Sequence, residues 1–324
     1  MANNYYPKLT MSKEMINISL ANPRGFCAGV ERAILIVEKT LEKYGAPIYV
    51  HHEVVHNKFV INELKKKGVI FVESLKEIPN SSHVIFSAHG VSKAIVKESN
   101  KFNLISIDAT CPLVTKVHRE VNKLSNDEYT IIMIGHKGHP EVEGTMGQIE
   151  KNSLTNQIHL VENIEDVNKL KVSNPNKLSY VSQTTLSIDD TKKIIDALKN
   201  KYPLIVGPKS NDICYATQNR QEAVKQMFSQ HDLVFVVGSK NSSNSNRLLD
   251  MVKDKNIDAI LIDDMAQFQS KWIKNKKSIG ITAGASAPEI LVQGLIQEIK
   301  KITEVSISEI KGIQETTVFK LPKI

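Results

Sequence analysis

Short apolar runs rich in β-branched residues alternate with longer amphipathic segments along most of the chain. The first run spans residues 16–20, and in the segment that follows, residues 30–43, apolar positions recur three and four residues apart. Strand-like runs that alternate with helical patterns are typical of parallel sheets covered by helices on both faces. The pattern therefore predicts an α/β protein with mainly parallel sheets.

The alternation occurs three times, and each repeat begins at one of the three cysteines, Cys27, Cys111 and Cys214. A first polar loop follows the cysteine after 29, 28 and 28 residues, at His56, His139 and Ser242. A second polar loop follows the same cysteines after 62, 73 and 72 residues, at His89, Thr184 and Ser286. Repeats of this length are small domains rather than solenoid units. We expect three α/β units related by a pseudo-threefold axis.

The predicted units are residues 28–110, 111–212 and 213–300. The first two end in apolar runs, 104–107 and 204–206, that lead to the next cysteine, whereas the third has no such run. We therefore expect the N-terminal strand, within residues 16–27, to complete the third unit. Residues 301–324 are expected to form a tail that packs across the surface, with an alternating piece at 316–319.

The cysteines and polar loops all follow predicted strands. In parallel sheets the loops after the carboxyl ends of the strands form the ligand site. Three units that face a common axis would bring three thiols together in a central cavity. Each cysteine also precedes a predicted helix, where free backbone N–H groups and the helix dipole stabilise a thiolate.

Composition places the protein among soluble globular proteins. The chain has 324 residues, of which 41% are hydrophobic and 24% charged. No apolar run approaches the ~18–20 residues of a membrane span, and residues 1–15 lack the apolar core of a signal peptide. We expect a cytoplasmic protein without a membrane partner. A disulfide framework is not expected, because three cysteines cannot all pair and the cytosol is reducing.

The formal net charge of +7 fits nucleic acid, an anionic small molecule or a lysine-rich surface. The lysines are scattered, aromatic residues make up only 6%, and no basic block is interleaved with aromatics. These features disfavour nucleic-acid binding. No Walker-type or GxGxxG loop is present, so a nucleotide ligand is not indicated either.

Three converging thiols could hold zinc with one open position or an iron–sulfur cluster. Structural zinc sites usually use closely spaced cysteine pairs, and this chain has none. One cysteine from each of three domains favours a 4Fe-4S cluster with one iron that has no protein ligand. The residues alone leave two other functions open, which are a zinc-dependent hydrolase of a phosphorylated metabolite and a basic RNA- or nucleotide-binding module without catalysis.

The polar loops supply donors suited to phosphate oxygens, namely His56, His89, His139, Ser242, Ser243, Asn244 and Ser286. Glu141 is the carboxylate of these loops that has histidine neighbours, and it is a candidate proton donor. Thr184 lies in an equivalent loop and could orient a substrate hydroxyl. These residue types together indicate a small phosphorylated substrate.

Eight segments resemble the motifs of one enzyme family, 4-hydroxy-3-methylbut-2-enyl diphosphate reductase of the methylerythritol phosphate route to isoprenoids. They are NPRGFCAG (22–29), FSAHGV (86–91), DATCPLV (108–114), GHPEVEGT (138–145), SQTTLS (182–187), DICYAT (212–217), GSKNSSNSNR (238–247) and TAGASAP (282–288). The resemblance covers residues 16–300 and shows no departure at a motif position.

The resemblance implies a three-lobed α/β fold around a central 4Fe-4S cluster, with Cys27, Cys111 and Cys214 as ligands. It implies that the substrate hydroxyl binds the fourth iron, and that the diphosphate is held by His56, His89, Ser242, Ser243, Asn244 and Ser286, with His139 close by. Glu141, aided by Thr184, would deliver the proton that turns the hydroxyl into water. Two electrons from a flavodoxin- or ferredoxin-type carrier would then yield isopentenyl or dimethylallyl diphosphate through an allyl anion-like intermediate.

Overall fold

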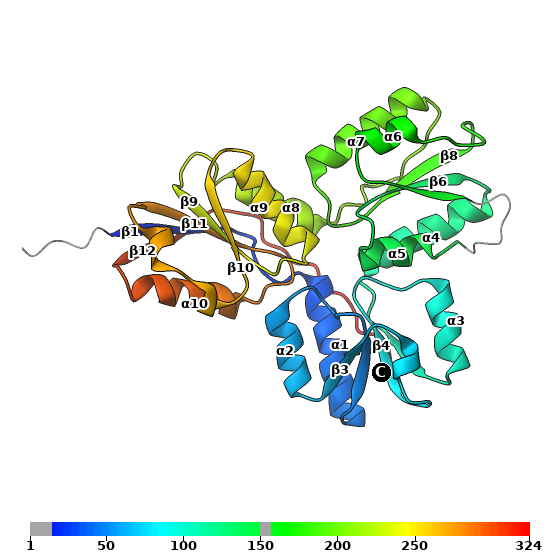
Figure 1. Ribbon diagram of the computed structural model, residues 1–324, viewed down its shortest axis with the longest axis horizontal. Coiled ribbons are helices and arrows are strands. Elements are labelled where there is room, and N and C mark those ends of the chain that lie inside the picture. The colour runs from blue at the N-terminus through cyan, green and yellow to red at the C-terminus, as the bar shows by residue number, and fades with distance from the viewer. Residues whose placement is uncertain (1–14, 150–156) are drawn as a thin grey trace, which may run out of the picture.

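Three separate parallel sheets, each flanked by helices, form three lobes that meet at the centre of the molecule (Figure 1). The computed structural model describes residues 15–149 and 157–324. Every pair of strands within the three sheets is parallel. The predicted α/β class with mainly parallel sheets is therefore confirmed. The polar residues 1–14, in which no signal peptide is expected, lie outside the described residues.

Lobe 1 contains the four-stranded sheet, in the order β3-β2-β4-β5. Its strands are β2 (Ile48–His51), β3 (Val69–Val72), β4 (His83–Phe86) and β5 (Ile105–Asp108). Its helices are α1 (Ala28–Tyr44), α2 (Lys58–Lys66), the short η1 (Leu75–Glu77) and α3 (Lys93–Lys101). Ile36 of α1 and Ile85 of β4 are fully buried in one hydrophobic cluster, so α1 packs its apolar face on this sheet.

Lobe 2 contains the three-stranded sheet, in the order β7-β6-β8. Its strands are β6 (Thr130–Ile134), β7 (Ile158–Val161) and β8 (Leu178–Ser182), and its helices are α4 (Pro112–Asn126), α5 (Pro140–Met146), α6 (Ile164–Lys169) and α7 (Ile188–Lys201). The strand expected at 204–206 is only a single bridge, between Val206 and Ser179. Pro203 and Pro208 flank this run and cannot donate ladder hydrogen bonds. Helix α5 begins at Pro140, because proline is favoured in a first helical turn.

Lobe 3 contains the five-stranded sheet, in the order β10-β9-β11-β1-β12. Its strands are β1 (Ile16–Leu20), β9 (Leu233–Val237), β10 (Asp258–Ile262), β11 (Ser278–Ala283) and β12 (Val305–Glu309). Its helices are α8 (Tyr215–Lys225), α9 (Ser243–Lys253), α10 (Glu289–Lys300) and the short η2 (Met265–Gln267) and η3 (Ser270–Ile273). The N-terminal strand β1 thus lies between two strands from the other end of the chain.

The interpretation of residues 301–324 as a surface tail is wrong at its start. Residues Val305–Glu309 form β12, which pairs with β1 along its whole length, from Ile16 opposite Val305 to Leu20 opposite Glu309. The second edge of β1 would otherwise leave its backbone groups unpaired. The alternating piece at 316–319 forms no strand.

The segment after β12 runs from lobe 3 to lobe 1, and the C-terminus lies beside lobe 1 (Figure 1). Glu315 forms an ion pair with Arg220 of α8 in lobe 3. Farther along, Leu321 and Ile324 pack against the hydrophobic cluster of lobe 1. We call residues 310–324 the C-terminal strap, because contacts with both lobes hold it in place.

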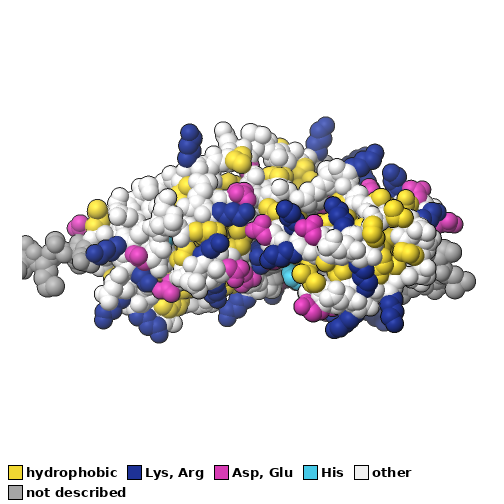
Figure 2. All heavy atoms as spheres, turned by 90° about the horizontal axis from the view of Figure 1, so that it is seen from above, with side chains coloured by type: hydrophobic (Ala, Val, Ile, Leu, Met, Phe, Trp, Pro, Cys, Tyr) yellow, Lys and Arg dark blue, Asp and Glu magenta, His cyan; other side chains and the backbone are white. Residues whose placement is uncertain are grey.

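The surface shown in Figure 2 carries Lys and Arg side chains interspersed with Asp and Glu rather than gathered in one patch. The positive net charge is therefore spread over this face. Within the described residues, no helix combines the length and the apolar character needed to cross a membrane.

Candidate functional site

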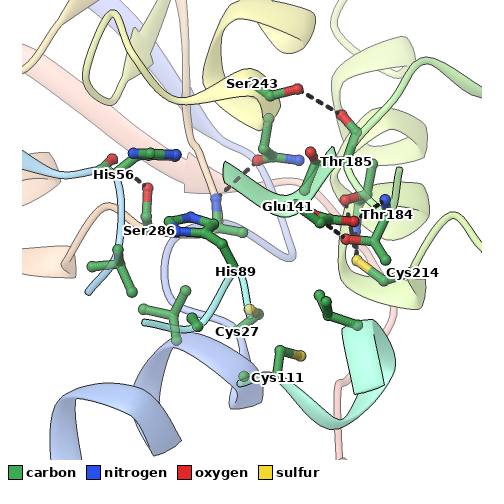
Figure 3. Close-up of a pocket in the computed structure, with 18 of the residues that line it drawn as sticks. Cys27, His56, His89, Cys111, Glu141, Thr184, Thr185, Cys214, Ser243 and Ser286 are labelled. Atoms are coloured by element: carbon green, nitrogen blue, oxygen red, sulfur yellow. Dashed lines mark hydrogen bonds between the residues drawn. The ribbon is translucent and has the colours of Figure 1, made fainter. Parts of the chain in front are cut away.

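The three cysteines occupy matching positions in the three lobes. Cys27 is the N-cap residue of α1, Cys111 that of α4 and Cys214 that of α8. All three line one cavity where the lobes meet, and Figure 3 shows their sulfur atoms around one part of it. The cavity has an empty volume of about 680 Å³, part of which is open to solvent.

The structure brings every predicted site residue to this cavity. Its wall contains Cys27, His56, His89, Cys111, His139, Glu141, Thr184, Cys214, Ser242, Ser243, Asn244 and Ser286. These residues come from all three lobes, and each lies in a loop after a strand or in the first turn of a helix. The shared position of parallel strand ends explains this convergence.

Gly29 allows the thiols of Cys27 and Cys111 to approach each other. A Cβ atom added at Gly29 would lie 2.7 Å from Cys111 Sγ and 3.9 Å from Cys27 Sγ. Both sulfur atoms thus face the same point in the first turn of α1. Any other residue at this position would push the Cys111 thiol away, so the glycine forms part of the thiol cradle.

The thiols do not behave as their positions at helix starts predict. Burial raises the pKa of Cys111 to about 12 and that of Cys214 to about 11, and it also raises the pKa of Cys27. Backbone N–H groups in the first turns act in the opposite direction but are outweighed. The expectation of stabilised thiolates is therefore wrong for the free thiols. A bound metal changes this balance, because a coordinating thiol is deprotonated.

The donor set fits an iron–sulfur cluster. Three thiols from three lobes face one cavity, and Cys214 Sγ accepts a hydrogen bond from Thr217 N at 3.4 Å and lies 3.2 Å from Thr217 Oγ1. Hydrogen bonds to the sulfurs are among the features that tune such clusters. Within residues 15–149 and 157–324, the side chains of His, Cys, Asp and Glu form no group of three arranged to hold a single metal ion.

Three histidine rings form a tight group on the cavity wall. The rings of His56 and His89 stack with centroids 4.1 Å apart, and His139 meets them edge-on at 5.3 and 5.6 Å. Burial lowers the pKa of His139 to about 3 and holds that of His89 well below its usual range, and the neighbouring rings add to both effects. His89 and His139 are therefore neutral at pH 7.

Several polar groups beside these rings lack partners or bridge two lobes. His56 Nε2 and Asn244 Nδ2 are buried and have no hydrogen-bond partner among the residues that the structure describes. Such groups cost about 1–3 kcal/mol each unless a ligand satisfies them. Ser286 Oγ donates to His56 O at 2.9 Å, and Ser243 Oγ donates to Thr185 O at 3.2 Å. This part of the wall is suited to an anion with several oxygen atoms.

The start of α9 contributes to the same wall. Ser242 is its N-cap residue, Ser243 is its first residue, and Asn244 follows. Free backbone N–H groups and the helix dipole make such a start a binding site for phosphate groups. The β9–α9 loop thus adds hydrogen-bond donors opposite the histidines of lobes 1 and 2.

Glu141 is the buried carboxylate of the cavity. Its Oε1 accepts a hydrogen bond from Thr184 N at 2.6 Å, and its Oε2 accepts one from Thr184 Oγ1 at 3.0 Å. Burial raises the pKa of Glu141 to about 7, and the charge of Asp212 acts in the same direction, against the two bonds from Thr184. A carboxyl group with this pKa can donate a proton near neutral pH.

Sequence reasoning missed two groups of residues near the cavity. Asn241 Nδ2 donates to Glu53 Oε2 at 2.7 Å, and the same oxygen lies 3.4 Å from His56 Nδ1. The sequence could have indicated Glu53, because it lies three residues before His56 in the same loop. The apolar lining, which includes Val30, Val55, Leu113 and Val114, carried no signal, because such residues look like ordinary core positions.

Comparison with known proteins agrees with this arrangement. Residues 18–300 match the family described as LytB protein. The chain is 56% identical over 315 residues to 4-hydroxy-3-methylbut-2-enyl diphosphate reductase of Nitrosomonas europaea, covering 95% of this chain and 97% of that protein. It is 57% identical over 308 residues to the protein of the same name from Dechloromonas aromatica, covering 95% and 99%.

Solved structures show the same fold. The structure of E-1-hydroxy-2-methyl-but-2-enyl-4-diphosphate reductase from Plasmodium falciparum superposes with a TM-score of 0.89 at 41% identity, covering 95% of this chain and 96% of that one. These matches run through all three lobes and confirm the resemblance found in the motifs. The chain therefore belongs to the LytB protein family.

Proposed function

We propose that the protein catalyses the reductive dehydration of 4-hydroxy-3-methylbut-2-enyl diphosphate to isopentenyl and dimethylallyl diphosphate. The observation that carries this proposal is the meeting of three thiols, a set of phosphate donors and a protonatable carboxyl group in one cavity. Relatives that carry the name of this reductase match along nearly the whole chain. The family and the site thus support the same chemistry.

The diphosphate would bind between the histidine group and the start of α9. The unpartnered His56 Nε2 and Asn244 Nδ2 gain acceptors there, and Ser242, Ser243 and Ser286 add hydroxyl donors. His89 and His139 are neutral in the free protein, and an adjacent diphosphate favours their charged forms. The apolar residues Val30 and Val55 would contact the hydrocarbon part of the substrate.

Cys27, Cys111 and Cys214 would hold a 4Fe-4S cluster. Such a cluster supplies electrons and, at the iron that has no protein ligand, a Lewis acid for the substrate hydroxyl. Gly29 leaves room for the thiols at this point. The electrons would come from a flavodoxin- or ferredoxin-type carrier in the cytoplasm.

Glu141 would donate the proton that allows the hydroxyl to leave. Overall, the substrate takes up two electrons and two protons, its C–O bond breaks, and the oxygen departs as water. One proton goes from Glu141 to the departing oxygen, and the second ends on carbon, where its position decides which of the two products forms. Thr184 holds the Glu141 carboxyl group in place through two hydrogen bonds.

The two alternatives from sequence receive less support. Relatives of more than half identity are named as the reductase rather than as a zinc-dependent hydrolase. A nucleic-acid-binding module would use a basic surface, and the face in Figure 2 carries charges of both signs. The reductase is therefore the function proposed.

The test is an anaerobic assay with substrate and a one-electron reductant, in which products are identified by mass spectrometry. We expect both five-carbon diphosphates and one water per substrate, with two electrons consumed. Product formation should stop when the reductant is omitted. Release of phosphate without electron consumption would contradict the proposal and favour a hydrolase.

A further inference from the structure

Each helix that begins at a cysteine carries a cationic side chain near its start. Arg32 lies five residues after Cys27, Lys116 five residues after Cys111 and Arg220 six residues after Cys214. Each of these three residues donates hydrogen bonds to carbonyl groups in a different part of the chain. In each case the carbonyl groups belong to the turn directly before another cysteine.

Arg32, on α1, contacts the turn that leads into Cys111. Its Nη1 donates to Thr110 O at 3.0 Å and to Ala109 O at 3.3 Å. These are the two residues directly before the cysteine. The helix that Cys27 begins thus holds the turn that carries the next cysteine.

Lys116, on α4, makes the equivalent contact with the turn before Cys214. Its Nζ donates to Ser210 O at 3.1 Å and to Asn211 O at 3.2 Å, and it lies 3.4 Å from Asp212 Oδ1. The end of β8 also holds this turn, because Ser182 N donates to Asp212 Oδ2 at 3.1 Å and Cys214 N donates to Thr184 O at 3.0 Å. Lys116 adds a contact from α4 to these bonds.

Arg220, on α8, returns to the turn before Cys27. Its Nε and Nη2 donate to Gly25 O at 3.0 and 2.7 Å, and Nη2 also donates to Phe26 O at 3.1 Å. Arg220 is fully buried. A buried charge needs full pairing, and here the carbonyl groups of the cysteine turn and Glu315 supply it.

We propose that Arg32, Lys116 and Arg220 form a closed ring of positioning residues, in which the helix begun by each cysteine fixes the turn of the next cysteine. Arg32 holds the turn before Cys111, Lys116 holds the turn before Cys214, and Arg220 holds the turn before Cys27. Each cysteine follows the sheet of one lobe and begins a helix that packs on the next lobe, and the ring adds a hydrogen bond from that helix to the turn before the next cysteine. The ring therefore links the three turns that carry the thiols.

The C-terminal strap supports two members of this ring. Glu315 accepts hydrogen bonds from Arg220 Nη1 at 3.0 Å and Nη2 at 3.2 Å, and Lys320 O accepts one from Arg32 Nε at 2.9 Å. For Lys116, the carboxyl group of Asp212 takes the role that the strap has for the other two residues. All three cations thus have a second partner that fixes their side chains.

The test measures how fast each cysteine in the full-length chain, freed of metal by a chelator, is alkylated by iodoacetamide. Arg32→Met and Lys116→Met keep an aliphatic stem but remove the donors. We expect Arg32→Met to accelerate labelling of Cys111, and Lys116→Met that of Cys214, by about tenfold, the effect of losing a charged hydrogen bond. Mass spectrometry separates the three sites.

The controls are Lys39→Met on α1 and Lys123→Met on α4, because both lysines are exposed on the same two helices. They should leave all three labelling rates unchanged, and Lys116→Arg should restore the slow rate at Cys214. Loss of positive charge alone makes a thiol less acidic and slows labelling. Faster labelling therefore reports opening of the turn.

The ring would be overturned by equal acceleration at all three cysteines, or by acceleration at the cysteine that begins the mutated helix. Unchanged rates in both variants would overturn it as well. A role of the ring in catalysis rests on the proposed function. The labelling assay itself needs neither cluster nor substrate. If anaerobically purified protein holds a cluster, a chelator should remove that cluster faster from both variants than from the unmodified protein. A protein without a cluster would refute the proposed function, and the labelling assay could still test the ring.

Discussion

Both carboxylate oxygens of Glu141 accept hydrogen bonds from the same residue, Thr184, one from its backbone N at 2.6 Å and one from its Oγ1 at 3.0 Å. This pair connects the start of α5 with the loop after β8. Burial raises the pKa of Glu141 to about 7 although both bonds favour the charged form. A carboxyl group that is partly protonated at neutral pH is thus held firmly in the cavity.

Replacing Glu141 with Gln should preserve the fold and substrate binding and remove most turnover. The amide can still accept from Thr184 N, but it cannot supply a proton. General acid catalysis contributes about a hundredfold or more, so we expect kcat to fall by at least that factor. Anaerobic kinetics and substrate titration measure the two effects separately, and near-normal kcat would remove Glu141 from the role of proton donor.

The pH dependence of turnover should follow the protonation of Glu141. Because the donor must carry its proton, kcat should be highest below about pH 7 and decline above it. Thr184→Val removes the hydroxyl donor but keeps the backbone N–H bond, so the charged carboxylate loses one stabilising bond and the pKa of Glu141 rises further. The decline should therefore move to higher pH in this variant. Thr185→Val serves as the control, and a decline at the same pH in Thr184→Val would show that the hydroxyl does not act on Glu141.

Binding of diphosphate should take up protons. His89 and His139 have lowered pKa values in the free protein and are neutral at pH 7, whereas a neighbouring diphosphate favours their protonated forms. Affinity should rise as the pH falls, by up to about tenfold per pH unit for each proton taken up. Calorimetry in buffers of different ionisation enthalpy measures the uptake. His159→Asn, outside the cavity on β7, should not change it, and proton release on binding would contradict the assignment.

Gly29→Ala should reduce metal binding without unfolding the protein. The added methyl group would lie 2.7 Å from Cys111 Sγ and force this thiol to move. We expect a lower iron content after anaerobic reconstitution and little change in thermal stability. Gly294→Ala is the matched control, because Gly294 also lies in a helix but its added Cβ meets only the flexible Met265 side chain, at 3.1 Å. Equal iron content in the two variants would argue against a cradle at Gly29.

Much of the site could be predicted because parallel strands end at one edge of a sheet. The spacing from Cys27 to His56 and His89 repeats in the other units, and the structure places all these loops around one cavity. The prediction of the site rested on the matching spacing after all three cysteines, and not on any property of Cys27 alone. The α/β class followed from the same alternation of strands and helices.

Long-range packing explains what could not be predicted. The strand β12 forms because β1 offers it an open edge, which no local pattern at residues 305–309 reveals. The raised pKa of Cys111 follows from burial between lobes, whereas sequence shows only the helix start. The spacing of Arg32, Lys116 and Arg220 from their cysteines was visible, but their partners lie 77 to 195 residues away along the chain.

The central claim is that Cys27, Cys111 and Cys214 hold an iron–sulfur cluster that serves the proposed reduction. Iron and sulfide analysis of anaerobically purified protein, together with its visible absorption before and after substrate is added, tests it most directly. We predict about four iron and four sulfide per chain, as in a 4Fe-4S cluster, a brown colour, and a spectral change on substrate binding. Colourless protein with one zinc per chain would contradict the account.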